Sequence, residues 1–390
     1  MQVANPSIRT RGHTRVPSSP TPPADANPTR HERLLSVLNT VPDPRDRRGV
    51  RYSLVGVLAL AVTATLAGCR SFAAIGQWAA ETAIDNLASF GLTSGSVPDE
   101  STLRKLFARI DADALDRALG TWMWTRTFTV EQRRVIALDG KTLRGARTRP
   151  DGKAPQLVAA FDHGAGAVLG QVAIDAKSNE IPAVRTLLGQ FDLEGAVVTL
   201  DAMHTQTDTA TAITGAGGDY VFTVKANMPT LHQTLKKLPW KDMPAHTATT
   251  VERGRRVTRT IKVADAPDWI DFPDAAQVAQ LRRTVTDKAT KTVEVVYLIT
   301  SANHTAAPPQ RLAAWVQGHW SIENRLHWVR DVTFAEDGSQ VRTGQAPRVM
   351  ATCRNLAIGI LRITGWDNIA AGLRHHARHP DHALKLILTS

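Results

Sequence analysis

The chain contains almost no cysteine. Only Cys69 and Cys353 occur among its 390 residues, and they lie far apart in the sequence. This scarcity excludes the disulfide framework of a small secreted protein and a zinc site built from several cysteines. We therefore expect a protein of a reducing, cytoplasmic environment.

A hydrophobic run long enough to span a membrane is missing as well. Residues 54–68 are apolar and uncharged, but they cover roughly 15 residues, whereas a spanning helix needs about 20. The run also begins too far from the N-terminus to be a signal peptide. The sequence thus predicts a buried helix at this position and no membrane partner.

Acidic residues are in short supply. The chain has 36 Asp and Glu residues against 47 Lys and Arg residues, which gives a formal charge of +11 and a pI near 10.0. A basic surplus of this size favours polyanions, with nucleic acid ahead of an anionic membrane. A solvated basic surface without a partner is the alternative. The length and the hydrophobic content of 43% fit one large domain or two to three ordinary ones.

The first third of the chain changes character near residue 30. Residues 1–30 are rich in proline and show no hydrophobic period, which predicts a disordered basic leader. Residues 31–130 have helical periodicity and are expected to form a helical N-terminal domain. Within it, residues 101–110 read as a basic amphipathic helix capped by Asp99 or Ser101. Its Arg and Lys side chains indicate either DNA-end binding by a helix-turn-helix-like unit or a solvated face.

Residues 131–390 have the pattern of an α/β domain followed by helices. Strands are expected at 134–139, 156–162, 167–174, 196–201 and 220–224, with helices at 181–190 and 207–214. Three successive strands followed by helix, strand, helix and strand is the order of an RNase H-like core. A β-rich insertion is expected at about 240–300, some of it extending the central sheet, because Thr, Val and Arg alternate partially there. Helices are expected from residue 308 to the C-terminus.

Two of the predicted strands end in an aspartate. The apolar run 135–138 leads into Asp139, and the run 196–200 leads into Asp201. Neighbouring strands of this kind would bring two carboxylates to one point. Such a pair suits Mg²⁺, which proteins commonly hold through one or two carboxylates.

A third acid is expected from a helix further along the chain. Trp315, Ile322, Leu326 and Val329 have the spacing of a buried helix stripe, and Glu323 borders this stripe. Packing of the stripe would direct Glu323 toward the sheet. Arg330 follows two turns later, so a regular helix would place it on the same face, where it would hold a phosphate.

Three other acids compete with Glu323 for this role: Asp331, Glu336 and Asp337. Asp331 lies about 12 Å further along a continuous helix, so it cannot share a site with Glu323. Glu336 and Asp337 precede Gly338 in an expected loop, where acids are usually solvated. We therefore expect Glu323 as the ligand, with Asp331 in reserve.

Three motifs carry a resemblance to a known family: residues 137–145 (ALDGKTLRG), 200–206 (LDAMHTQ) and 319–332 (HWSIENRLHWVRDV). Together they closely resemble bacterial insertion-sequence DDE transposases of the ISAs group, the H-repeat-associated type. The resemblance covers nearly everything after residue 30. It implies an RNase H-like DDE enzyme that cuts element ends and transfers strands to target DNA, with Asp139, Asp201 and Glu323 as the catalytic and metal-binding triad.

The resemblance also implies the cofactor and the partners. The expected metal is Mg²⁺, for which Mn²⁺ can substitute, and the expected partner is double-stranded DNA, bound by a homodimer or higher assembly in the cytoplasm at the nucleoid. Lys141, Arg144, His319 and Arg330 are the candidate DNA contacts. Related transposases often place Tyr and Arg ahead of the glutamate and Lys after it, and here Val316, His319 and Arg330 occupy those places.

Several alternatives stay open at this point. The chain is either an active transposase, a DNA-binding remnant that no longer cuts, or a metal-dependent nuclease without strand transfer. A zinc site of His319, Glu323 and His327 would have poor tetrahedral geometry from one straight helix. His204 and Gln206 either contact DNA or cap the next helix, and we favour the cap. The histidines at 375–379 are expected on a solvated basic surface.

Overall fold

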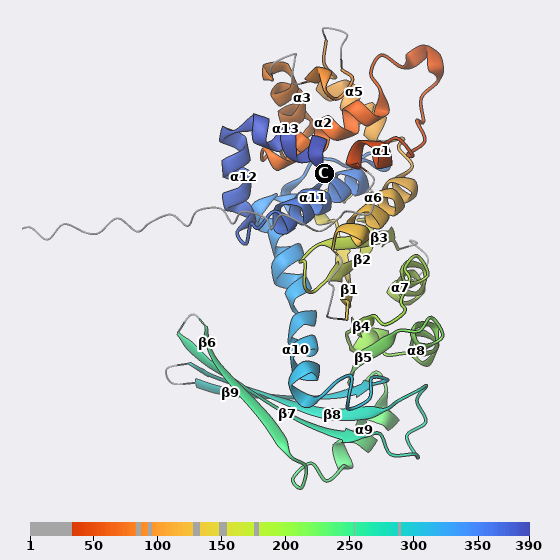
Figure 1. The fold of residues 1–390 in the computed structure, drawn as a ribbon, viewed down its shortest axis with the longest axis vertical. Coiled ribbons are helices and arrows are strands. Elements are labelled where there is room, and N and C mark those ends of the chain that lie inside the picture. Colours follow the sequence, from red (N-terminus) through yellow and green to blue (C-terminus); the bar gives the residue numbers. More distant parts are fainter. Residues whose placement is uncertain are drawn as a thin grey trace, which may run out of the picture. The chain divides into compact units, whose positions relative to one another are not determined.

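The computed structural model describes residues 33–82, 87–92, 96–127, 133–147, 154–174, 179–252, 254–287 and 290–390. The segment 1–30, predicted to be a basic leader, lies outside these residues. His31–Ser390 form one compact unit (Figure 1).

A mixed sheet forms the centre of this unit. Its first five strands are β1 (Val135–Thr142), β2 (Gln156–Asp162), β3 (Val168–Ala173), β4 (Val197–Leu200) and β5 (Asp219–Val224). They lie in the order β3-β2-β1-β4-β5, with β1, β2 and β3 antiparallel and β1, β4 and β5 parallel. Helices α7 (Glu180–Leu188) and α8 (Thr207–Thr214) are the connections between the parallel strands. The predicted RNase H-like core is confirmed.

The β-rich insertion extends this sheet. Its strands are β6 (Ala245–Glu252), β7 (Arg255–Asp265), β8 (Gln277–Asp287) and β9 (Thr290–Thr300), preceded by helix α9 (Pro229–Lys237). Strand β9 pairs with β5 in the antiparallel sense, and β8, β7 and β6 follow, so the described strands make one nine-stranded sheet. The insertion and the core therefore share one hydrogen-bond ladder.

Both faces of the core strands are covered. Successive residues of a strand point to opposite faces, and the packing follows this alternation. Val197 and Val221 pack with Trp315 of helix α10 (Pro309–His319), whereas Val198 and Phe222 belong to the larger core on the other face. The strands are apolar on both sides for this reason, which is the usual pattern of parallel strands between helices.

The N-terminal helices pack against the C-terminal ones. The former are α1 (Leu34–Leu38), α2 (Leu54–Leu66), α3 (Phe72–Glu81), α5 (Glu100–Phe107) and α6 (Ala112–Arg126), and the latter are α11 (Ala346–Ile363), α12 (Ile369–Arg378) and α13 (Pro380–Thr389). Helix α2 is buried on nearly every side and contacts α11. This confirms the predicted buried helix and explains why it lacks a polar face. Among the described residues, no helix has both the length and the hydropathy that crossing a bilayer requires.

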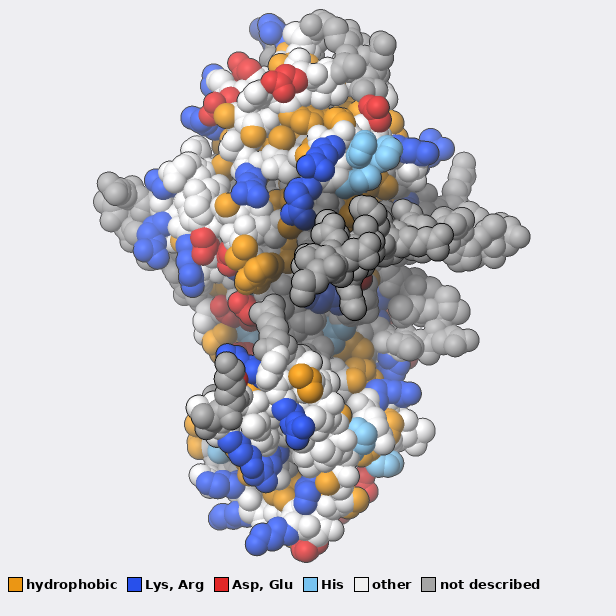
Figure 2. Space-filling model, turned by 90° about the vertical axis from the view of Figure 1, so that its left-hand side faces the viewer, with side chains coloured by type: hydrophobic (Ala, Val, Ile, Leu, Met, Phe, Trp, Pro, Cys, Tyr) orange, Lys and Arg blue, Asp and Glu red, His pale blue; other side chains and the backbone are white. Residues whose placement is uncertain are grey.

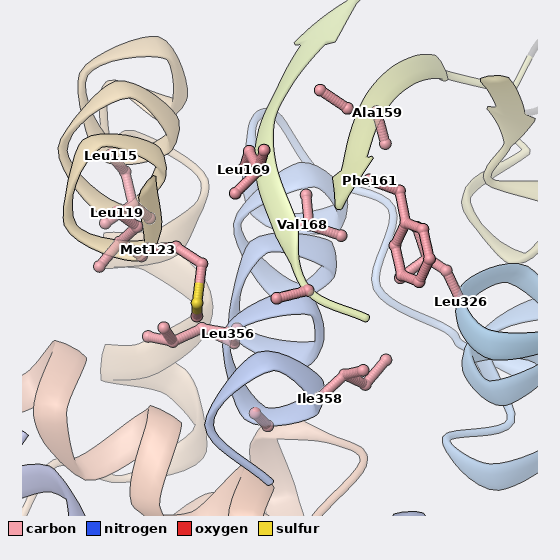
Figure 3. Packing of buried hydrophobic residues seen from close by; sticks show 14 of the residues in the cluster. Leu115, Leu119, Met123, Ala159, Phe161, Val168, Leu169, Leu326, Leu356 and Ile358 are labelled. Atoms are coloured by element: carbon pink, nitrogen blue, oxygen red, sulfur yellow. The ribbon is translucent and has the colours of Figure 1, made fainter. Parts of the chain in front are cut away.

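Helix α6 joins the helical layer to the sheet. Leu115, Leu119 and Met123 of α6 lie near strand β3 and near Leu356 of α11 (Figure 3). Gly120 permits the approach, because a Cβ atom there would lie 2.3 Å from the carbonyl oxygen of Leu169. The helices predicted for 31–130 are confirmed, and they pack as part of the compact unit.

Two smaller predictions have different outcomes. Asp99 is the N-cap of α5, since its side chain accepts a hydrogen bond from the Thr102 backbone N–H, as predicted. The histidines at 375–379 are not all on a solvated surface, because His376 is buried at the end of α12.

The chain beyond α10 is not a regular helix. Glu323–His327 and Val329–Thr333 form π-helical turns, in which the N–H of Trp328 bonds to the carbonyl of Glu323 and that of Phe334 to Val329. Each such i→i+5 turn inserts one residue into the helical repeat. Side chains seven apart therefore no longer share a face in this segment.

Candidate active site

Asp139 and Asp201 come from adjacent parallel strands. The register pairs Ala137 of β1 with Thr199 of β4, and each aspartate stands two residues beyond its member of that pair. Asp139 lies within β1, and Asp201 directly follows β4. The sheet therefore places Asp201 close enough to Asp139 for the two carboxylates to influence each other, although Asp201 lies outside the closest ligand group of Asp139, Glu323 and His327.

Glu323 reaches Asp139 from the first π-helical turn. His327 lies with them: its Nδ1 is 3.1 Å from Oε2 of Glu323 and 3.5 Å from Oδ2 of Asp139. One ligand atom from each of the three residues lies within 4.8 Å of the others. The structure thus brings the predicted first and third acids together, with a histidine that the predicted triad did not include.

The electrostatic environment of this group is mixed. Burial is the main reason that the pKa of Asp139 is raised, and the nearby carboxylates of Asp201 and Glu180 raise it further, against the lowering effect of His327. The pKa of Glu323 is lowered, chiefly by its hydrogen bond with His327. Three carboxylates close enough to interact favour a bound cation, since like charges disfavour joint ionisation.

The donor set fits a hard divalent cation. Carboxylate oxygens from Asp139, Asp201 and Glu323 are the ligands that Mg²⁺ and Mn²⁺ prefer, and an imidazole such as His327 is better suited to Zn²⁺ than to Mg²⁺. The zinc site considered from the sequence would have taken all three ligands from one straight helix. In the structure, Glu323 and His327 of the π-helical turn lie beside Asp139 of strand β1, so the ligands come from two elements. His319 lies outside this group and bonds to Thr199 instead.

Comparison with known proteins gives this arrangement a family. The sequence model of the transposase DDE domain matches residues 131–360, and the model of the domain associated with it matches residues 35–123. The chain belongs to the transposase DDE domain family.

Relatives of this DDE-family chain are found in bacteria. "Putative transposase YncI" of Escherichia coli O157:H7 is 32% identical over 344 residues, which cover 84% of this chain and 87% of the relative. "H repeat-associated putative transposase YhhI" of E. coli K12 is 31% identical over 364 residues, covering 89% and 94%. The predicted resemblance to the H-repeat-associated type is confirmed.

A solved structure is also similar to the DDE-family chain. The cryo-EM structure of the piggyBac transposase synaptic complex with hairpin DNA aligns over 91% of this chain and 76% of that one, with a TM-score of 0.41 and 12% identity.

The predicted DNA contacts of the DDE-family chain differ in exposure. Arg144 is open to solvent, with its side chain 73% exposed and 3.6 Å from Asp337. Lys141 is nearly buried, and its Nζ lies 2.6 Å from Oδ2 of Asp331. Asp331, the reserve candidate for the third acid, is therefore paired with Lys141 and does not lie with Asp139 and Glu323.

Two of the predicted contacts need correction. Arg330 is fully buried, and its guanidinium pairs with Glu336 at 2.7 Å, so it presents no surface to a phosphate. His319 is buried as well, with Nδ1 3.0 Å from the Thr199 hydroxyl, and burial lowers its pKa to about 4. The π-helical segment turns Arg330 inward while the Glu323 side chain stays 69% exposed, whereas His319 precedes that segment and ends α10 against Thr199 of β4.

Glu336 is the centre of a buried ionic network. Its two carboxylate oxygens accept hydrogen bonds from Arg330 and from Arg354 of α11. Burial alone would raise the pKa of Glu336, but the two guanidinium groups outweigh it and the pKa is lowered. The expectation of a solvated loop acid is wrong here, because two cations compensate its desolvation.

His204 and Gln206 do not cap the helix that follows Asp201. Helix α8 begins at Thr207 without a side-chain cap, and the Gln206 amide bonds to the Met203 carbonyl. His204 is buried, with Nε2 3.4 Å from Oε2 of Glu180 and 4.0 Å from Oδ1 of Asp201. Sequence reasoning missed Glu180, and the one available signal was its position at the start of the helix that follows the third strand.

Proposed function

We propose that the protein is a DNA transposase that cleaves the ends of an insertion sequence and joins them to target DNA with the help of a divalent cation. The observation that carries this proposal is the convergence of Asp139 and Glu323 beside Asp201, in a chain of the transposase DDE family. An RNase H-like core with acids at these positions suits phosphodiester chemistry.

The chain's own residues would act mainly by positioning. Asp139, Asp201 and Glu323 would hold Mg²⁺, or Mn²⁺ in its place, which when bound polarises the phosphate and activates the attacking water or 3′-hydroxyl. His327 would orient Glu323 through its Nδ1. Lys141, bonded to Asp331, would stabilise the fold beside the site and would not bind a phosphate directly.

DNA would be bound by the exposed basic and aromatic surface. Arg144 is exposed, 3.6 Å from Asp337, and Trp320 and Trp328, on the segment that carries Glu323, are partly exposed. Exposed aromatic rings stack on bases, and arginine side chains bind the backbone. Figure 2 shows Lys and Arg side chains over the part of the surface that the insertion forms. Exposed examples there are Arg255, Arg256, Arg282 and Lys291. The assembly of two or more copies on DNA stays a prediction.

The test uses the purified full chain and a duplex that carries the inverted repeat flanking the gene. Cleavage and strand transfer are followed with Mg²⁺ or Mn²⁺ for the wild type, for Asp139→Asn and for the control Asp268→Asn, which changes an exposed loop acid. We expect Asp139→Asn to bind the duplex but to lose at least about 100-fold in cleavage, since removal of a metal ligand costs several kcal/mol.

The control should match the wild type. Cleavage by Asp139→Asn within threefold of the wild type would remove Asp139 from the site. Cleavage without strand transfer by the wild type would favour the nuclease alternative, and DNA binding without cleavage would favour the remnant.

A further inference from the structure

A fourth carboxylate lies beside the triad. Glu180 is the first residue of α7, and its carboxylate rests against the α-carbon of Gly140, the residue after Asp139. A Cβ atom at position 140 would lie 2.4 Å from Oε1 and 2.7 Å from Oε2 of Glu180. Only glycine at this point of β1 leaves room for the carboxylate to approach the strand.

A buried histidine joins this carboxylate to Asp201. His204 is 1% exposed, and within the described part of the chain neither of its ring nitrogens makes a hydrogen bond. Its Nε2 points between Glu180, at 3.4 Å, and Asp201, at 4.0 Å. Buried polar groups are normally hydrogen-bonded. An imidazole that has no partner and points at two carboxylates therefore indicates a site where those carboxylates bind a ligand or move close enough to accept its hydrogen bond.

Carboxylates of like charge lie near one another around Asp139. Asp139 interacts with both Asp201 and Glu180, and Lys141, two residues further along β1, is paired with Asp331. The Glu180 side chain is 24% exposed and rests against Gly140, so it stays near Asp139, whereas the Asp201 side chain is 51% exposed. A divalent cation resolves the repulsion between like charges, because it neutralises the carboxylates and uses their oxygens as ligands.

We propose that Glu180 is a fourth carboxylate of the divalent-cation centre, on the side of Asp139 that faces Asp201, and that His204 is the positioning residue that holds Glu180 and Asp201 for the ion. The inference rests on the proposed function, since it extends the same centre. Glu180 would add its carboxylate to those of Asp139, Asp201 and Glu323, and a divalent cation held by them would supply Lewis-acid chemistry for a phosphodiester.

The experiment measures binding of Mn²⁺ to the full chain without DNA, by the electron paramagnetic resonance signal of the free ion. Glu180→Gln keeps the shape of the side chain and removes its charge, and Glu194→Gln makes the same change at an exposed position. We expect Glu180→Gln to weaken Mn²⁺ binding at least tenfold. Glu194→Gln should match the wild type, and thermal melting of each variant verifies that it is folded.

A second route displaces Glu180 without changing it. Gly140→Ala places a Cβ atom where the carboxylate lies, so it should weaken Mn²⁺ binding in the wild type. In a Glu180→Ala background the same substitution should have little further effect, because the clash is gone. An equal loss in both backgrounds would mean that Gly140 acts independently of Glu180 and would count against the proposal.

The role of His204 is tested by rescue. His204→Gln retains a donor at about the position of Nε2 and should keep Mn²⁺ affinity within threefold, whereas His204→Leu should lose at least tenfold. Equal affinity of both variants, normalised to the folded fraction, would remove the positioning role.

The outcomes separate this inference from the proposed function. Unchanged Mn²⁺ binding in Glu180→Gln would overturn the role of Glu180 as a fourth carboxylate ligand. Cleavage of DNA by the wild type would still support the proposed transposase activity. Loss of Mn²⁺ binding in Glu180→Gln, with a wild type that binds Mn²⁺ but cleaves no DNA, supports the inference and overturns the proposed activity. Failure of the wild type to bind Mn²⁺ overturns the inference.

Discussion

Asp139 and Asp201 stand at the same level on two neighbouring parallel strands, each two residues beyond the paired Ala137 and Thr199. Backbone hydrogen bonds between β1 and β4 set this relationship as far as Thr199, and Asp201 directly follows the last residue of β4. A one-residue slip of either strand would turn its aspartate to the opposite face of the sheet. The apolar residues that precede each aspartate fix this register, because both faces of the sheet are covered.

The third acid is tested by two substitutions made in parallel. Glu323→Gln should abolish metal-dependent cleavage of end DNA, because Glu323 lies with Asp139 and His327. Asp331→Asn should reduce cleavage less than tenfold, since Asp331 is bonded to Lys141 instead. Both variants are assayed with Mg²⁺ and with Mn²⁺. Survival of cleavage in Glu323→Gln with its loss in Asp331→Asn would reverse the assignment.

Much of the fold could be predicted from the apolar pattern. The runs before Asp139 and Asp201 are short, branched and uninterrupted, which is typical of strands buried on both faces. The stripe Ile322, Leu326 and Val329 is buried as expected. The sequence could not show which way the polar residues of this segment point. A period of 3.6 residues assumes a regular helix, and the π-helical turns shift Arg330 into the core.

Arg330 should affect stability and not DNA affinity. Arg330→Met would leave Glu336 with one guanidinium partner in a buried site, and breaking a buried ion pair costs about 3 to 5 kcal/mol. Arg144→Met, at an exposed position, should change the free energy of unfolding by less than about 0.5 kcal/mol. Denaturant unfolding and DNA titration measure the two quantities.

The opposite result would support the prediction from the sequence that Arg330 binds a phosphate. If Arg330→Met unfolded like the wild type and bound DNA tenfold more weakly, Arg330 would be a phosphate contact. We expect this weaker binding from Arg144→Met.

Acid should destabilise the fold through its buried histidines. Burial lowers the pKa of His319 to about 4 and that of His163 to about 3, and both rings contact the Thr199 hydroxyl. The unfolded chain therefore takes up protons near pH 6.5 that the folded chain does not, so stability falls as the pH falls from 6.5 toward 4. Each histidine should contribute a loss of up to about 2 kcal/mol at pH 5.

His319→Asn isolates one of these contributions. It lacks the titrating group, so its free energy of unfolding should decline less between pH 7 and pH 5, by up to about 2 kcal/mol. His304→Asn, in an exposed loop, is the matched control. Parallel stability curves for His319→Asn and the wild type would show that His319 does not titrate differently in the folded chain.

The N-terminal helices should supply much of the affinity for element ends. Arg104 and Lys105 are exposed on α5, so replacing both with Ala should reduce the slope of log affinity against log salt by about one to two, as loss of phosphate contacts requires. The full chain is the right sample, because α2 and α6 pack on α11 and β3. If the wild type bound end DNA and random duplex with equal affinity, the binding would be electrostatic and not specific for the ends.

The site was only partly accessible to sequence reasoning. Asp139, Asp201 and Glu323 could be proposed because each adjoins an apolar pattern, although β1 does not end at Asp139 as predicted but continues to Thr142. Glu180 and His204 adjoin no such pattern, and their roles depend on how α7 meets the turn after β4. Their proximity is a property of tertiary packing, which spacing along the chain does not encode.

The pairing of β5 with β9 has a consequence for how the protein is made. Strand β5 ends at Val224, but the strand that covers its outer edge begins only at Thr290, and the segment that carries Glu323 comes later still. During synthesis the edge of β5 stays open, and an open edge invites pairing with other chains. A chain released before residue 300 would thus hold both aspartates on a sheet prone to aggregate. The insertion must be synthesised before the sheet can close, so the candidate active site is completed only late in translation.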